Sequence, residues 1–248
     1  MLHNSLKNFG SYAHLMGRTF SRPDRWKEFL KCYIDEIYKL GVNSIPIVII
    51  ISLFIGAVIA IQMQLNIVSP LLPKYTVGVA TREIILLEFS STMLALILSG
   101  KVGSNIASEI GAMRVTEQID ALEIMGINSA NYIILPKIAG MVTFMPVLVI
   151  FSMATGILGG YAIAVLTGII SISVLTYGIQ AFFNEFYIWY ALFKSLFFAY
   201  IISSIASFYG YTVKGGSLQV GKASTNAVVV SSVMILLIDV IITQIMMG

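Results

Sequence analysis

The sequence has few charged residues and almost no cysteine or histidine. Charged side chains make up 11% of its 248 residues, whereas a soluble domain carries about 25%. The single cysteine, Cys32, excludes an internal disulfide and a cysteine metal cluster. The two histidines, His3 and His14, lie near the N-terminus, and no nucleophile–base pair or metal-ligand cluster stands out. We therefore expect neither a catalytic nor a metal site on this chain.

Long hydrophobic runs are present instead. Hydrophobic residues form 58% of the sequence, and the mean hydropathy is +0.91. A helix needs about 20 apolar residues to cross a bilayer. Runs of about that length or more cover residues 44–65, 84–102, 138–166, 187–208 and 227–246. The sequence predicts an all-α integral membrane protein with about five transmembrane helices, formed by residues 43–248.

Residues 1–42 mix basic, acidic and aromatic side chains. Ser21-Arg22-Pro23-Asp24 is typical of a helix start, with Pro23 at the first helical position. The apolar residues from Trp26 to Leu40 then recur at helical spacing. Basic plus aromatic residues on one helix favour an amphipathic helix in the membrane interface, although a helix packed on the bundle is the alternative. No signal peptide is recognisable, so we expect the first span to act as an uncleaved signal.

The distribution of lysine and arginine predicts the orientation. The basic residues assigned to one side are Lys7, Arg18, Arg22, Arg25, Lys27, Lys31, Lys39, Lys101, Arg114, Lys137, Lys214 and Lys222. The other side holds only Lys74 and Arg82. The positive-inside rule then places the N-terminus and the 103–137 loop in the cytoplasm and the C-terminus outside. The net charge of +3 is modest, and because the basic residues gather near the N-terminus it indicates membrane orientation, so we expect no nucleic-acid partner.

A polar stretch, residues 104–126, separates the second and third spans. Its charged residues are Glu109, Arg114, Glu117, Asp120 and Glu123. The apolar stripe of its first half does not continue into its second half, which predicts a break near Val115–Thr116. We expect Thr116 to cap a short second helix that Gly126 ends.

This short helix has an apolar and a polar side. Ile119, Leu122 and Met125 form the apolar side, and Asp120 and Glu123 form the polar one. About nine residues are too few for a stable isolated helix in water. The helix therefore either lies in a groove of another protein or is an ordinary solvated loop helix.

A few polar residues lie within or beside the spans. Gln62 and Glu88 are candidates to face a cavity, or they mark the membrane interface. Lys194 and Asp239 lie inside the fourth and fifth spans, where Asp239 could pair with Lys194 or Glu88. Small residues at positions 56 and 60, and glycines at 156 and 160, are typical of close helix contacts.

A glycine-rich segment precedes the fifth span. Gly216 to Lys222 nearly matches a nucleotide-binding P-loop, but Ala223 replaces the required hydroxyl residue and no buried strand precedes the segment. We therefore interpret the segment as a structural loop with tight turns. Its glycines are Gly210, Gly215, Gly216 and Gly221.

Residues 109–126, Glu-Ile-Gly-Ala-Met-Arg-Val-Thr-Glu-Gln-Ile-Asp-Ala-Leu-Glu-Ile-Met-Gly, closely resemble the signature of the MlaE family, the permease subunits of lipid-transporting ABC systems. Gly100–Ser104 and the glycine-rich segment resemble further family motifs. The family's Arg-Glu pair is represented here by Leu87-Glu88, so only the acid carries over. The resemblance covers about residues 20–248.

The resemblance implies the function and the partners. The chain would be a permease that moves phospholipid, with ATP and Mg²⁺ on a separate ATPase and no cofactor of its own. It implies a homodimer, an MCE-domain partner outside and a STAS-type small subunit, all at the bacterial inner membrane. Residues that would contact the ATPase are Glu109, Arg114, Glu117, Ile119, Asp120, Leu122 and Glu123. The alternative is a stand-alone secondary transporter or ion-coupled channel that uses the intramembrane charges.

Overall fold

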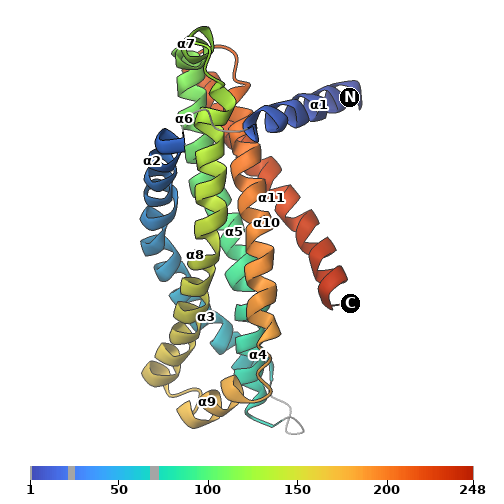
Figure 1. Ribbon diagram of the computed structural model, residues 1–248. Helices are drawn as coiled ribbons and strands as arrows, with labels where there is room; N and C mark the ends of the chain where they lie inside the picture. Colours follow the sequence, from blue (N-terminus) through green and yellow to red (C-terminus); the bar gives the residue numbers. More distant parts are fainter. Residues whose placement is uncertain (1, 22–25, 68–72, 248) are drawn as a thin grey trace. The chain divides into compact units, whose positions relative to one another are not determined.

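The computed structural model describes residues 2–21, 26–67 and 73–247, and over those residues it contains helices and no strand (Figure 1). The α-helices are α1 (Leu2–Thr19), α2 (Trp26–Glu36), α3 (Ile45–Asn66), α4 (Thr76–Ile84), α5 (Leu94–Leu98), α6 (Ser104–Val115), α7 (Gln118–Ile124), α8 (Ser129–Thr167), α9 (Ile172–Gln180), α10 (Phe186–Tyr211) and α11 (Ser217–Met247). Short π-helical or 3₁₀ turns, Ile37–Gly41, Val42–Ser44, Ile85–Met93 and Ser99–Gly103, continue the helices around them.

The described residues include five continuous helical stretches that are long and apolar enough to cross a membrane. They are Trp26–Asn66, Thr76–Val115, Ser129–Thr167, Phe186–Tyr211 and Ser217–Met247. This confirms the predicted all-α membrane fold. Several helices begin about ten residues earlier than predicted, because hydropathy marks only the apolar part of a helix that starts in a polar turn.

The N-terminal segment contains two helices, α1 and α2. Helix α2 confirms the predicted helix before the first span, whereas its proposed start at Pro23 lies outside the described residues. Helix α1 was not predicted. The chain forms two compact units: a first unit of Met1–Val42, Ala95–Phe144 and Phe197–Ile241, and a second unit of Asn43–Leu94, Met145–Leu196 and Ile242–Gly248.

Close helix contacts through small residues hold the second unit together. A Cβ atom added to Gly56 would collide with the backbone of Gly156, and one added to Gly159 would collide with that of Leu53. Gly160 faces the methyl group of Ala60. The predicted small-residue pairs of α3 and α8 are therefore confirmed as a packing interface, in which backbones approach more closely than larger side chains allow.

The second unit buries an arginine at one end. Arg82, 1% exposed, donates to the carbonyl oxygens of Ile179 at 2.9 Å and of Ala181 at 2.6 Å. It therefore satisfies carbonyls at the end of α9, which the helix itself leaves without partners. The sequence analysis had used Arg82 only to predict the orientation of the chain in the membrane.

In the first unit, α6 packs on α10 and α11. The hydroxyls of Ser104 and Ser224 are 2.8 Å apart. Gly210 lies inside α10, where an added Cβ would lie 2.7 Å from the carbonyl oxygen of Ala107. The prediction of a glycine turn is wrong for Gly210 and also for Gly221, which lies inside α11.

The turn between α10 and α11 is short. Gly215 has a φ of +109°, a conformation that favours glycine, and Gly216 comes directly before α11. Only these two of the glycines predicted for a structural loop lie between helices.

Candidate functional site

Helix α7 lies in the loop between the second and third spans. The residues on either side of it, Glu117 and Gly126, have a left-handed backbone conformation. Helix α6 ends at Val115, which confirms the predicted break. Thr116 does not cap α7, because its hydroxyl donates back to the carbonyl oxygen of Ala112 at 2.9 Å. The residue before α7 is instead Glu117, with a φ of 60°.

Gly126 ends α7 as predicted. Its φ is +77°, and its N–H bonds the carbonyl oxygen of Glu123, while the N–H of Ile127 bonds that of Leu122. These two bonds form a Schellman motif, which satisfies carbonyl groups at the helix end.

The apolar side of α7 is only partly covered. Ile119 is fully buried and Leu122 half-buried, as the periodicity indicated. Met125 was predicted on the same side, but it is 65% exposed, and the neighbouring Ile124 is 87% exposed. The helix thus presents an apolar tip that the first unit does not cover.

The polar side of α7 is held by a cluster around one carboxylate oxygen, here called the Glu123 cluster (Arg18, Glu123, Ser129 and Tyr211). Glu123 Oε1 lies 2.9 Å from Arg18 Nη2, from the Ser129 hydroxyl and from the Tyr211 hydroxyl. The two hydroxyl oxygens are 2.8 Å apart. Because each hydroxyl has one hydrogen to donate, at most two of the three contacts among the Glu123, Ser129 and Tyr211 oxygens are hydrogen bonds at any moment. The cluster joins α7 to α1, α8 and α10.

The contacts of this cluster favour the charged forms of its ion pair. The hydrogen bond from Arg18, then that from Ser129, lowers the pKa of Glu123 below its ordinary value of 4.5, against the opposing effect of burial. The hydrogen bond to Glu123 raises the pKa of Arg18. Both side chains are 39% exposed, so the pair is partly screened by solvent.

The start of α8 also fixes the end of α1. Asn131 Nδ2 donates to the carbonyl oxygens of Thr19 at 2.8 Å and of Ser21 at 2.6 Å, and Asn128 Nδ2 donates to that of Arg18 at 3.0 Å. These bonds serve carbonyls that the last turn of α1 leaves free. The sequence analysis missed this attachment, although the amphipathic pattern of residues 2–19 could have indicated the helix itself.

Arg114 and Asp120, two predicted partner contacts, bind each other. Arg114 Nη1 lies 2.6 Å from Asp120 Oδ1, and its guanidinium lies 5.8 Å from the ring centre of Tyr211. This pair connects α6 to α7 across the break. Charged residues predicted to face a partner are therefore used partly within the chain.

Glu109 belongs to a different group, the Lys137 cluster (Glu36, Lys39, Glu109 and Lys137). Lys137, with a side chain 3% exposed, lies 2.5 Å from Glu36 and 3.0 Å from Glu109. Lys39 lies 2.6 Å from the same Glu109 oxygen. The cluster joins α6 and α8 to the α2 segment, so Glu109 holds helices together rather than lying beside α7.

The candidate cavity residues lie in the second unit. Glu88 lies 3.4 Å from Lys194 Nζ and accepts a 3.1 Å bond from Thr92, while 46% of its side chain is exposed. Lys194 is fully buried, 4.8 Å from the ring centre of Tyr190. Gln62 is exposed on α3. The structure therefore pairs Glu88 with Lys194, which the sequence analysis did not propose, and the suggested pairing of Asp239 with either residue stays a prediction.

No group of three or more His, Cys, Asp or Glu side chains within the described ranges could hold a metal ion.

Comparisons with known proteins agree with this architecture. The Permease MlaE family model matches residues 33–245. A probable ABC transporter permease protein of Rickettsia bellii is 31% identical, and the match covers 98% of this chain and 92% of the relative. The intermembrane phospholipid transport system permease protein MlaE of Haemophilus influenzae is 32% identical over 94% of this chain and 89% of the relative. A probable ABC transporter permease protein of Synechocystis is 31% identical over 80% and 75%. The chain therefore belongs to the MlaE permease family and is a multi-pass membrane transport subunit.

Proposed function

We propose that this chain is the permease of an ABC-type transporter that moves phospholipid between the bacterial inner membrane and an MCE-domain protein outside it. It works as a homodimer, and ATP and Mg²⁺ bind to a separate ATPase subunit. A small STAS-type subunit completes the cytoplasmic side. The family and the name of the Haemophilus relative support phospholipid as the cargo.

The observation that carries the proposal is the exposed apolar tip of α7, Ile124 and Met125. A seven-residue helix is too short to be stable by itself, yet its polar side is bonded to four other helices, to α1, α8 and α10 through Glu123 and to α6 through Asp120. This leaves the apolar tip free to enter a groove, the mode in which amphipathic helices bind partner proteins. We assign this tip to the ATPase.

Charge supports a cytoplasmic position for α7. Within the continuous helical stretch Thr76–Val115, Arg82 lies near the start and Arg114 near the end that leads to α7. The positive-inside rule then places α7 and the N-terminus in the cytoplasm and the C-terminus outside.

The Glu123 cluster supplies a route for the movement. When the ATPase displaces α7, the short bonds of Glu123 Oε1 act on the ends of α1, α8 and α10 together. Helices α8 and α10 are spans, so their cytoplasmic ends tilt with α7. The half-exposed Glu88 and its partner Lys194 are the polar groups in the second unit that we assign to the lipid headgroup.

The proposal is tested by co-purification and lipid transfer. The double variant Ile124→Glu/Met125→Glu should insert normally but lose the co-purifying ATPase, because two carboxylates cannot be buried in an apolar groove. Leu166→Glu, at an equally exposed apolar site at the far end of α8, is the matched control and should keep the ATPase.

Normal ATPase binding and ATP-driven lipid transfer by the α7 double variant would contradict the proposal. A specific observation, the Glu88–Lys194 pair within the membrane-spanning helices, favours a stand-alone ion-coupled transporter as the second candidate. Transport by the isolated chain in vesicles without ATP would support that candidate instead.

A further inference from the structure

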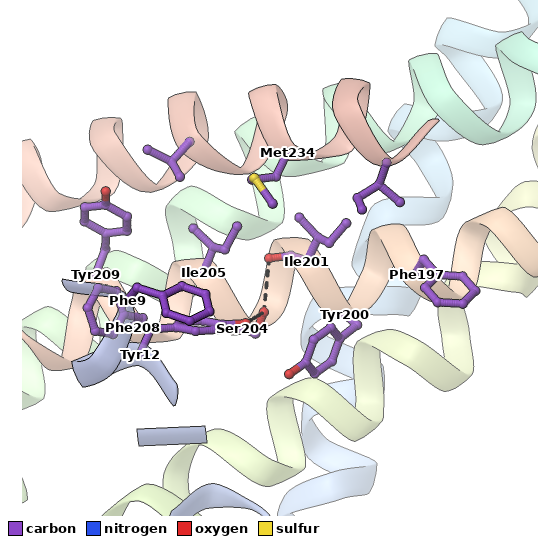
Figure 2. A pocket seen from close by; sticks show the side chains of 12 residues that line it. Phe9, Tyr12, Phe197, Tyr200, Ile201, Ser204, Ile205, Phe208, Tyr209 and Met234 are labelled. Atoms are coloured by element: carbon purple, nitrogen blue, oxygen red, sulfur yellow. Dashed lines mark hydrogen bonds between the residues drawn. The ribbon is translucent and has the colours of Figure 1, made fainter. Parts of the chain in front are cut away.

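An apolar cavity lies in the first unit between α1, α10 and α11 (Figure 2). Its volume is about 400 Å³. Phe9 and Tyr12 of α1, seven residues of α10 between Phe197 and Tyr209, and Val230, Met234 and Ile238 of α11 line it. It shares no residue with the Glu88–Lys194 pair, which lies in the second unit. We name it the α10 cavity.

The lining of the α10 cavity suits hydrocarbon. Figure 2 shows Phe9 and Phe208 at one end and Phe197 at the other, with Ile201 and Ile205 between them. Every polar side-chain atom in the lining is a hydroxyl oxygen. Two of these oxygens bind each other, since the Tyr12 hydroxyl donates to Ser204 at 2.9 Å. A charged or strongly polar ligand would lose its water here without replacement.

The volume of the cavity distinguishes between two apolar occupants, a transmembrane helix of a partner and a single acyl chain. One turn of an α-helix, about 10 Å wide and 5.4 Å long, already fills roughly 400 Å³. A transmembrane helix of a partner, with about 20 residues, could therefore not enter the cavity and would only lie across its open side. A single acyl chain is flexible and thin, and small-ligand cavities start at about 300 Å³. Because α10 and α11 are spans, the acyl chains of the bilayer surround this part of the protein.

We propose that the α10 cavity binds one acyl chain of a resident membrane phospholipid, distinct from the transported lipid. The chain fills the space between α1 and the spans and so holds α1 against α10. The end of α1 carries Arg18, which binds Glu123 of α7. The resident lipid therefore stabilises the Glu123 cluster. This inference goes beyond the proposed function and needs only that the spans lie in a membrane.

The test uses the full-length protein, without any ATPase, in phosphatidylcholine–phosphatidylglycerol nanodiscs. The probe is a phosphatidylcholine with a photoreactive diazirine near the end of one acyl chain. After irradiation, mass spectrometry should find lipid adducts on residues 197–209 at about ten times the level on Leu236, Leu237, Val240 and Ile241, which are exposed residues of α11 outside the lining. Ile201→Trp, which fills the cavity, should reduce the adducts on residues 197–209 about tenfold.

Leu237→Trp, at an exposed position of α11 outside the lining, is the matched control and should leave the adducts unchanged. Met234→Phe replaces Ile201→Trp if the latter does not fold. Equal labelling of both segments, or labelling unaffected by either filling variant, would show ordinary annular lipid and overturn the proposal. A crosslink from residues 197–209 to a second copy of the chain would also overturn it. Since no ATPase is present, these outcomes are independent of the proposed transport function.

Discussion

Among the residues whose burial the structure describes, two lysines are buried, one in each compact unit, and their surroundings differ. Lys137 in the first unit lies 2.5 Å from Glu36 and 3.0 Å from Glu109. Lys194 in the second unit lies 3.4 Å from Glu88 and 4.8 Å from the ring centre of Tyr190. The partners of Lys137 are largely buried, whereas Glu88 is half exposed.

The difference indicates that Lys137 is a structural charge, whereas the Glu88–Lys194 pair is suited to binding a ligand. A buried charge is tolerated when short bonds to opposite charges replace its water, and Lys137 meets that condition through two carboxylates. The longer Glu88–Lys194 contact leaves Glu88 reachable from solvent or lipid. We therefore expect the Lys137 cluster to determine folding and the Glu88–Lys194 pair to determine lipid transfer.

The largest expected effect comes from Lys137→Met. The substitution leaves Glu36 and Glu109 without their shared cation, and breaking a buried pair in this way costs about 3–5 kcal/mol. Unfolding of the purified protein in detergent, followed by tryptophan fluorescence, measures the change. Adding Glu36→Gln should recover part of the loss because it removes a buried charge. An unchanged midpoint for Lys137→Met would show that the cluster is not structural.

A smaller effect on folding is expected for Lys194→Met. Glu88 keeps its Thr92 bond and its solvent contact, so the free energy of unfolding should change by less than about 1 kcal/mol. Lipid transfer by the reconstituted complex should fall about tenfold. The comparison between the two lysines fails if Lys194→Met destabilises the protein as much as Lys137→Met does.

The exposed Arg18–Glu123 pair should give the smallest effect, and it should depend on pH. Because the pKa of Glu123 is lowered in the folded state, its stabilising contribution is fully present above pH 4.5 and is lost as the pH falls through the folded pKa. Hydrogen-exchange protection of residues 118–126, relative to intrinsic rates, should decrease about threefold over that range. Glu123→Gln should remove this pH dependence, and an identical profile in that variant would refute the assignment.

The sequence predicted the features that depend on local pattern. Hydropathy located the five spans, the change of apolar face located the break at Val115, and Gly126 marked the end of α7. Small residues at Gly56 and Gly156 indicated close helix contacts, although not that α3 and α8 would meet each other. Each of these follows from spacing within a single helix or from the conformation of a single residue.

The unpredicted features depend on which helices meet. Arg18 and Glu123 are 105 positions apart, and Glu109 and Lys137 are 28 apart, so no helical spacing relates them. Glu109 was predicted to contact an ATPase from the family resemblance, yet the packing of α6 places it beside Lys39 and Lys137. Thr116 could have capped α7, but its bond to Ala112 competes with that role.

The shared oxygen of Glu123 has a genetic consequence. Arg18, Ser129 and Tyr211 all bond to the same atom, so losing the carboxylate removes three contacts in one step. After that loss, a second substitution at Arg18 has little left to remove, whereas one at Tyr211 still removes its contacts with Ser129 and Arg114. The four positions therefore form one epistatic group, in which combined substitutions cost less than the sum of the single ones.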